Sequence, residues 1–419
     1  MTTFPVPHGA GPPASHLPSR RRHGPPEECA NAERAVRVVR TPRRQPQLHT
    51  RRALRSSLSP RCSPRSCAPY ALPVTTHLAP DLLDRAAGVL VVQACGDALG
   101  VPYEFATPPR ADEAAVMRGG GLGPYAPGEW SDDTQMAVCV ARVAAQGRGL
   151  TTEGPLDDVA AAFEAWLTGG ASDVGTQTAA VLRNAAHLPG RPAARLRAAS
   201  QALHVSTGRT AGNGALMRTG IVGVVALDDR TETARAARAV AELTHTDPLA
   251  GESCVLWSEA VRVAITQGML DVRAGLDLLP PGRRTLWAAW IADAEQDRPT
   301  ADLGANGFTV TAFQAAWHAI ASTKVPDGGA QLERDGSAAS SGAVAERAPH
   351  TVRALQAAVR IGGDTDTVAA IAGALLGARY GTSDLPAEWL DLVHGWPGLD
   401  AEGLGELAHA TARRGRSIP

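Results

Sequence analysis

Two short segments group carboxylates and hydroxyls where apolar helical stretches begin, and this grouping indicates metal-dependent chemistry. The six side chains concerned are Ser131, Asp132, Asp133, Asp364, Asp366 and Thr367. Helix capping is the simpler explanation, because Ser, Thr and Asp are preferred at helix N-termini and one cap contributes about 1 kcal/mol. A cap needs only one such side chain, however, and neighbouring carboxylates repel one another unless a cation compensates them. If the two segments meet in space, their oxygen ligands suit Mg²⁺, Mn²⁺ or Ca²⁺.

Other polar residues interrupt apolar surroundings. Asp97 follows an apolar helical stretch and Glu104 lies seven positions later; alone, they read as a helix terminator and a loop acid. Gly212 and Asn213 begin a small-residue turn whose backbone N–H groups could approach a phosphate or a ribose. His245 lies in a Thr-His-Thr-Asp segment that ends one helical stretch and caps the next, where a histidine is more often structural than catalytic. Because the chain has no GxSxG motif and no cysteine in a polar setting, a nucleophilic triad is not indicated.

Helices must position these residues, because apolar side chains recur at three-to-four spacing almost throughout the chain from Leu82 onward. The clearest helical stretches are 81–100, 134–147, 158–167, 231–245, 251–268 and 367–381. Several of them end on glycine, as helix C-termini commonly do. Alternating β-branched runs are scarce, and residues 221–225 are the best strand candidate. The pattern predicts an all-α domain over 78–419, with a mobile Gly/Ser-rich loop at about 326–346.

The first 77 residues differ in composition from the rest and are expected to be a disordered Arg/Pro/Ser-rich extension. Residues 1–75 contain 13 Arg and three acidic residues, although the whole chain carries a net charge of −1. An arm that touches nucleic acid is one interpretation. An extension without a function, or a misassigned start codon, is the favoured one, and no nucleic-acid partner is expected.

The sequence contains none of the patterns that direct a protein into or across a membrane or that indicate disulfide bonds. The chain has no run of about 18 apolar residues and no charged-then-apolar leader, so neither a membrane span nor a secretory signal is expected. Its six cysteines include no CxxC pair. Free structural thiols are therefore expected rather than a disulfide framework, as is usual in a reduced compartment. These features predict a cytoplasmic protein.

Taken in order, the polar segments resemble those of the ADP-ribosylglycohydrolase family. The motifs that carry the resemblance are GDALGVPYE, WSDDTQMA, SDVGTQT, GNGALMR, THTD, NGFTVTAFQAAWHA and GGDTDTVAAIAGALLGARYG. They run in family order from about residue 80 to the C-terminus and leave the N-terminal arm unmatched. The resemblance implies a compact bundle of a dozen or more helices, in agreement with the helical periodicity.

The resemblance also implies roles for individual residues. Two divalent cations, Mg²⁺ or Mn²⁺, would be held by the six side chains named at the start, with Ser131 where many relatives have Thr. Glu104 matches the mobile acid that serves as general acid or base, and Asp97 matches a supporting acid. Substrate phosphates and ribose would be bound by Asp173, Gly175, Gly212 and Asn213. His245 and Phe308 match positions that line the cleft; Phe308 would either stack on adenine or belong to the core.

The function implied by the resemblance is removal of ADP-ribose from a modified protein side chain, at the glycosidic bond of the distal ribose. ADP-ribosyl-arginine is the first choice of substrate and ADP-ribosyl-serine the second, and the chain is expected to act as a monomer. A metal-dependent phosphohydrolase with the same carboxylates would release AMP instead. A non-catalytic relative, like the lens crystallins of this family, should have lost metal ligands or the mobile acid, whereas this chain has all of them.

Overall fold

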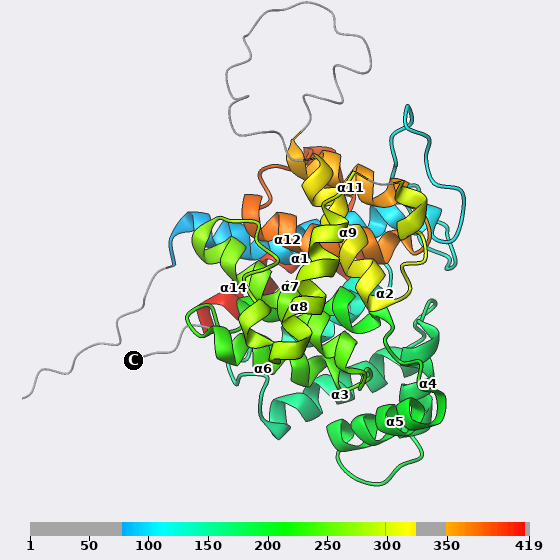
Figure 1. Ribbon diagram of the computed structural model, residues 1–419, viewed down its shortest axis with the longest axis vertical. Coiled ribbons are helices and arrows are strands. Elements are labelled where there is room, and N and C mark those ends of the chain that lie inside the picture. The colour runs from blue at the N-terminus through cyan, green and yellow to red at the C-terminus, as the bar shows by residue number, and fades with distance from the viewer. Residues whose placement is uncertain (1–77, 298, 324–348, 415–419) are drawn as a thin grey trace, which may run out of the picture. The chain divides into compact units, whose positions relative to one another are not determined.

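The computed structural model describes residues 78–297, 299–323 and 349–414, which belong to one compact unit, Pro73–Pro419. The predicted disordered extension and the predicted mobile loop at about 326–346 lie outside the described residues. The α-helices are α1 (Pro80–Gly100), α2 (Asp132–Ala144), α3 (Glu153–Thr168), α4 (Thr176–Ala185), α5 (Pro192–Thr207), α6 (Arg230–Ala241), α7 (Pro248–Gln267), α8 (Pro281–Ala294), α9 (Thr309–Thr323), α11 (His350–Arg360), α12 (Thr365–Tyr380), α13 (Ala387–Leu392) and α14 (Ala401–Arg414). The prediction of an all-α domain is therefore confirmed (Figure 1).

Short 3₁₀ helices and one small hairpin complete the described structure. The 3₁₀ helices are η1 (Val101–Tyr103), η2 (Asn213–Arg218), η3 (Gly220–Val224), η4 (Leu276–Leu278) and η5 (Thr300–Leu303). The strands β1 (His394–Gly395) and β2 (Leu399–Asp400) pair antiparallel and form the only sheet among the described residues.

The strand candidate at 221–225 was wrong, because these residues form most of η3. A side chain at Gly223 would lie 2.5 Å from the carbonyl oxygen of Ser258 in α7, so this segment packs closely against a helix. A short apolar run cannot be assigned to strand or helix by periodicity alone.

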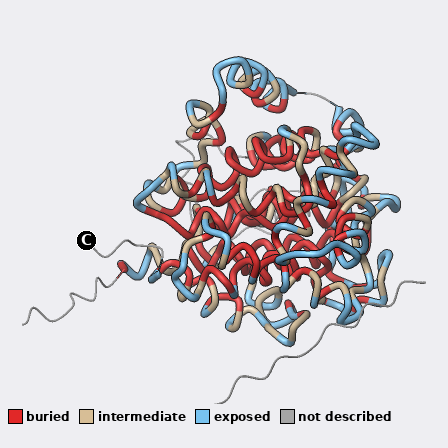
Figure 2. Tube along the Cα trace, turned by 90° about the horizontal axis from the view of Figure 1, so that it is seen from below, coloured by how far each residue is buried: buried red, intermediate tan, exposed pale blue. Residues whose placement is uncertain are grey.

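Helices α1 and α12 pack together at the centre of the fold, where the chain is most deeply buried (Figures 1 and 2). Their backbones touch: a Cβ atom at Gly88 would lie 2.3 Å from the carbonyl oxygen of Gly377, and one at Gly96 would lie 2.3 Å from that of Ala369. One helical turn further on, a Cβ atom at Gly100 would lie 2.4 Å from the Cα atom of Asp366. This contact therefore places the C-terminal end of α1 directly against the N-terminal end of α12.

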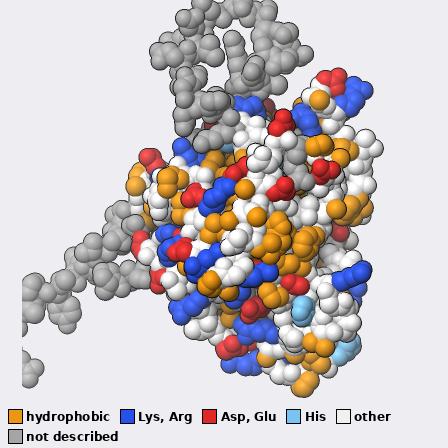
Figure 3. All heavy atoms as spheres, viewed as in Figure 1, with side chains coloured by type: hydrophobic (Ala, Val, Ile, Leu, Met, Phe, Trp, Pro, Cys, Tyr) orange, Lys and Arg blue, Asp and Glu red, His pale blue; other side chains and the backbone are white. Residues whose placement is uncertain are grey.

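The most apolar helix and the cysteines of the described residues lie in the core, and charged side chains lie on the surface. Helix α1 with η1 has the length and apolar composition of a membrane span, and its most apolar 18-residue window is wholly buried inside the domain, as in a core helix. The cysteines Cys95, Cys139 and Cys254 are free thiols in the core, as predicted for the described ones. On the face shown in Figure 3, acidic and basic side chains of the described residues are interspersed, with hydrophobic side chains between them.

Candidate active site

Asp97 joins α1 to the start of α2. One carboxylate oxygen accepts hydrogen bonds from the backbone N–H and the hydroxyl of Ser131, both at 2.8 Å. The other accepts from the backbone N–H and the hydroxyl of Thr134, at 3.0 and 2.7 Å. Asp97 thus caps the N-terminus of α2 from a different helix and does not terminate α1, which continues to Gly100.

The side chains at the N-cap positions of the two acidic segments do not cap their helices. Ser131 and Asp364 occupy the N-cap positions of α2 and α12, but neither side chain accepts a hydrogen bond from its own helix. Asp366 does accept from the backbone N–H of Thr367 at 3.0 Å, so helix capping accounts for one side chain of the two segments and not for the others. Asp247, by contrast, caps α7 as the sequence predicted, because its side chain accepts from the backbone N–H of Leu249 at 2.9 Å.

The loop before α12 depends on two glycines and on a buried asparagine. Gly362 and Gly363 have φ values of +79° and +76°, which favour glycine. Asn306 donates to the carbonyl of Gly362 at 2.9 Å and accepts from the backbone N–H of Asp364 at 2.8 Å. Asn213 donates to the Asp364 carboxylate at 2.8 Å. The loop that presents Asp364 is thus held from two sides.

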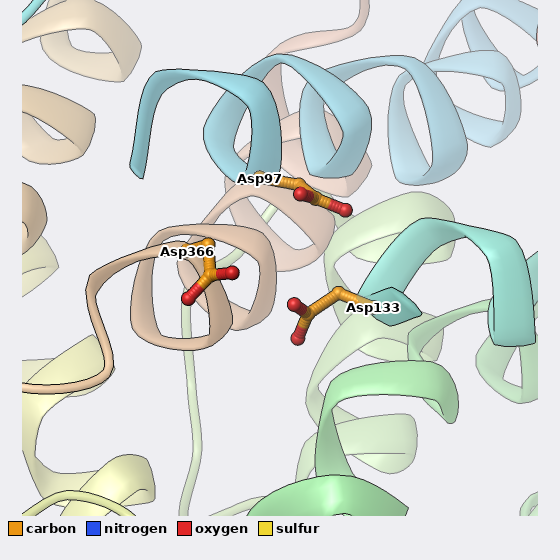
Figure 4. Close-up of side chains that lie close together, drawn as sticks. All are labelled: Asp97, Asp133 and Asp366. Carbon is orange, nitrogen blue, oxygen red and sulfur yellow. The ribbon is translucent and has the colours of Figure 1, made fainter. Parts of the chain in front are cut away.

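The two acidic segments meet at the end of α1, as the metal hypothesis required. Carboxylate oxygens of Asp97, Asp133 and Asp366 lie within 4.8 Å of one another, and so do those of Glu104, Asp364 and Asp366. Asp366 belongs to both groups. Figure 4 shows the first group, whose carboxylates converge from α1, α2 and α12 on one space.

The buried carboxyl groups of this cluster have raised pKa values. Burial is the largest cause in each case: it raises the pKa of Asp97 to about 6, against the four hydrogen bonds that lower it. Burial and neighbouring aspartates raise the pKa values of Asp132, Asp133 and Asp366 well above the ordinary value. One oxygen of Asp133 is buried without a hydrogen-bond partner. Such a set fits hard divalent cations, which would satisfy the orphaned oxygen and favour the ionised carboxylates.

A cavity of about 380 Å³ opens beside the carboxylates. Nine of the predicted site residues line it: Glu104, Asp132, Asp173, Gly175, Gly212, Asn213, His245, Asp364 and Thr367. Asp97, Ser131, Asp133 and Asp366 do not line it and are buried behind its wall. Predicted metal ligands and predicted substrate-binding residues therefore share one site.

Glu104 is the half-buried acid of this cavity. Burial, followed by the charges of Asp173, Asp364 and Asp132, raises its pKa to about 9. Burial and the neighbouring carboxylates thus favour the protonated form of Glu104. A carboxylic acid in this state can donate a proton to a leaving group.

Two aromatic residues lie differently from what the sequence indicated. Phe308 is 41 % exposed, so its assignment to the core is wrong. It is not among the residues that line the cavity, although its backbone pairs with that of Gly212. Phe105 is 63 % exposed and does line the cavity. Its place beside Glu104 is the one feature of the sequence that could have indicated it.

Asn306 and Arg218 are the residues of this site that the sequence did not reveal as functional candidates. Both are fully buried; Asn306 bonds to the backbone of Asp364, and Arg218 bonds to Thr244, whose hydroxyl lies 2.7 Å from Nδ1 of the cavity residue His245. Each lies within a motif of the family resemblance, and this is the one signal that could have drawn attention to them.

The helical fold and the carboxylate-lined cavity are those of a known class of hydrolase. A solved structure described as an ADP-ribosylglycohydrolase-related protein complex superposes with a TM-score of 0.59 and 25 % identity, over 81 % of this chain and 100 % of that one. The family model for ADP-ribosylglycohydrolases matches residues 78–417. The chain therefore belongs to the ADP-ribosylglycohydrolase family.

Curated relatives agree with this membership. An ADP-ribosyl-dinitrogen reductase glycohydrolase of Rhodospirillum rubrum is 28 % identical over 74 % of this chain and 90 % of its own length. The ADP-ribosylarginine hydrolase Tri1 of Serratia proteamaculans is 26 % identical over 74 % of this chain and 75 % of its own length. The protein of the same name from Pseudomonas putida is 27 % identical, with 74 % of each chain covered.

Proposed function

We propose that this chain is a divalent-cation-dependent hydrolase that releases ADP-ribose from an ADP-ribosylated protein. ADP-ribosyl-arginine is the first choice of linkage, since two of the curated relatives carry that activity in their names. ADP-ribosyl-serine is the second. The observation that supports the proposal best is the pair of carboxylate groups that share Asp366 at the wall of the cavity.

Two cations, Mg²⁺ or Mn²⁺, would be held by six residues of α2, α12 and their N-caps. These are Ser131, Asp132, Asp133, Asp364, Asp366 and Thr367. When bound, the cations would supply Lewis acidity, holding ribose hydroxyls and lowering the pKa of a water. Asp97 would act indirectly, because its four hydrogen bonds fix the start of α2, from which Asp132 and Asp133 project.

Glu104 is proposed as the general acid. Cleavage at the anomeric carbon builds positive charge on the ribose and negative charge on the departing atom of the acceptor side chain. The protonated Glu104 would transfer its proton to that atom, and its carboxylate would then take a proton from the attacking water. The neighbouring Asp173, whose pKa is itself raised by burial, helps to keep the Glu104 proton in place before the reaction.

The rest of the cavity is proposed to hold the ADP moiety. Gly175 and Gly212 leave the backbone accessible, and Asn213 is held by the carbonyl of Asn306 and by Asp364. Phe308, exposed beside this turn, is available to stack on adenine at the edge of the cavity.

The test is incubation of the full chain with ADP-ribosyl-arginine and ADP-ribosyl-serine peptides, in Mg²⁺, Mn²⁺ or EDTA, with products read by mass spectrometry. Intact ADP-ribose, released only with a divalent cation, is expected. Release of AMP would instead establish the phosphohydrolase, and equal release in EDTA would overturn the role of the cations.

Glu104→Gln tests the general acid separately. The variant should bind the cations and ADP-ribose but lose at least about a hundredfold in kcat, the usual contribution of general acid–base catalysis. Glu388→Gln makes the same chemical change at an exposed position of α13 and should retain full activity. A fully active Glu104→Gln enzyme would remove Glu104 from the mechanism.

A further inference from the structure

Arg218, at the end of η2, is a buried cation that forms no ion pair with a carboxylate of the described residues. It has no exposed surface, and its guanidinium carbon lies over the ring of Phe163, 4.5 Å from the ring centroid. Its hydrogen bonds go to the sulfur of Met136, the carbonyl of Val240 and the hydroxyl of Thr244, the last at 2.7 Å. Burial lowers the pKa of the guanidinium to about 10, so it remains charged at neutral pH.

Thr244 connects this cation to the cavity. Its hydroxyl lies 2.7 Å from Arg218 and 2.7 Å from Nδ1 of His245, and the side chain is fully buried. An arginine side chain can only donate, so the Thr244 oxygen is the acceptor of that bond. The hydroxyl hydrogen is then free to go to His245. Because a buried O–H without an acceptor is costly, this hydrogen is donated to Nδ1.

His245 must therefore carry its own hydrogen on Nε2. Burial and the charge of Arg218 hold the pKa of the ring well below its usual range, which leaves it neutral. Among the described residues Nε2 has no hydrogen-bond partner, although His245 is only 1 % exposed and lines the cavity. Cβ atoms at Gly212 and Gly214 would lie 3.3 and 3.4 Å from Nε2, so both glycines keep the cavity side of the ring clear.

We propose that Arg218 and Thr244 are positioning residues that fix His245 as the neutral tautomer with hydrogen on Nε2. This N–H donates to an oxygen of the ligand in the cavity. The lining includes no Arg or Lys among the described residues, and the hydrogen bonds through Thr244 connect the buried Arg218 to a side chain that does line the cavity. The identity of the ligand, the ADP-ribosyl group, rests on the proposed function, whereas the tautomer does not.

The tautomer is measured by long-range ¹H–¹⁵N NMR of the full chain labelled with ¹⁵N-histidine. The His245 signals are assigned by their loss in His245→Gln. Wild type and Thr244→Ser, which keeps the hydroxyl, should both show protonated Nε2 and unprotonated Nδ1. Thr244→Val should give a mixture of tautomers. Hydrogen on Nδ1 of His245 in the wild-type spectrum would overturn the inference.

Ligand binding is tested by calorimetry with ADP-ribose and by KM and kcat on the ADP-ribosyl-arginine peptide. Thr244→Val should weaken binding about three- to tenfold, the usual effect of one misplaced hydrogen bond, and raise KM more than it lowers kcat. Thr244→Ser should restore binding. Thr233→Val, which removes a buried hydroxyl from α6, is the matched control and should bind like wild type.

The outcomes separate the two levels of the proposal. If wild type neither binds ADP-ribose nor releases it, the proposed function fails, while the NMR result still decides the tautomer. If wild type binds ADP-ribose and Thr244→Val binds it equally well with an unchanged tautomer, the relay is refuted and Thr244 is merely structural.

Discussion

The carboxylates of the site should make the cation-free protein less stable as pH rises. A carboxyl group whose folded-state pKa is raised contributes stability that is present below its unfolded pKa and is lost as pH rises through its folded pKa. For Glu104 these values are the ordinary 4.5 and about 9. Between pH 6 and pH 8 its contribution to the free energy of unfolding should fall by about 2 to 3 kcal/mol.

The assay is thermal unfolding of the full chain in EDTA at pH 6, 7 and 8. For a domain of this size, 2 to 3 kcal/mol corresponds to a fall in Tm of about 3 to 4 °C. Other groups titrate in the same range, so the decisive quantity is the difference between two variants. Glu104→Gln should have a shallower pH slope than wild type, by about one proton, and Glu388→Gln should keep the wild-type slope.

Added Mg²⁺ or Mn²⁺ should raise Tm more at pH 8 than at pH 6, because the cations bind the ionised carboxylates. A cation at a hundred times its Kd would add about 2.7 kcal/mol. The reasoning is refuted if Glu104→Gln and Glu388→Gln have the same pH slope in EDTA, or if divalent cations leave Tm unchanged at pH 8.

Two further substitutions test the shared carboxylate, Asp366, and Asn306, which holds the loop before α12. Asp366→Asn, at the carboxylate that both groups share, should weaken Mn²⁺ binding by calorimetry at least tenfold and abolish hydrolysis, with the helical CD spectrum retained; undiminished Mn²⁺ affinity would contradict the two-group assignment. Asn306→Ala removes a buried side chain that satisfies the backbone of Gly362 and Asp364. It should cost about 2 to 4 kcal/mol in urea unfolding and also weaken Mn²⁺ binding, whereas Asn→Ala at exposed Asn184 should do neither. An Asn306→Ala protein as stable as wild type would show that the loop before α12 does not depend on the hydrogen bonds of Asn306.

The helices of this protein could be predicted because their signal is local. The stretch 81–100 was assigned from apolar spacing, and α1 spans Pro80–Gly100. The segment 231–245 corresponds to α6, which ends earlier, at Ala241, because the chain turns there to present Thr244 and His245. A helical pattern continues through such a turn, so the sequence placed the helix correctly and its end four residues too late.

The acidic residues of the site could also be predicted, since several carboxylates at two helix N-termini exceed what capping needs. Their supports could not. Asn306 acts on Asp364 across 58 positions, and Asp97 acts on Ser131 across 34. The local sequence around a buried Asn or Arg does not predict its hydrogen-bond partner, because these bonds form only when helices distant in sequence pack together. Spacing therefore identified the chemical groups and not the residues that orient them.

The backbone contact between α1 and α12 makes the site sensitive to change at a distance. Gly88 lies nine residues before Asp97, about 13 Å away along the helix. With carbonyl groups this close, the helices have no room to slide; the next register that would mesh is about one turn, or 5.4 Å, away. Such a step exceeds the 4.8 Å within which the carboxylate oxygens gather. A single methyl group added at Gly88 is thus expected to inactivate the protein remotely, by separating the carboxylates of the proposed cation site.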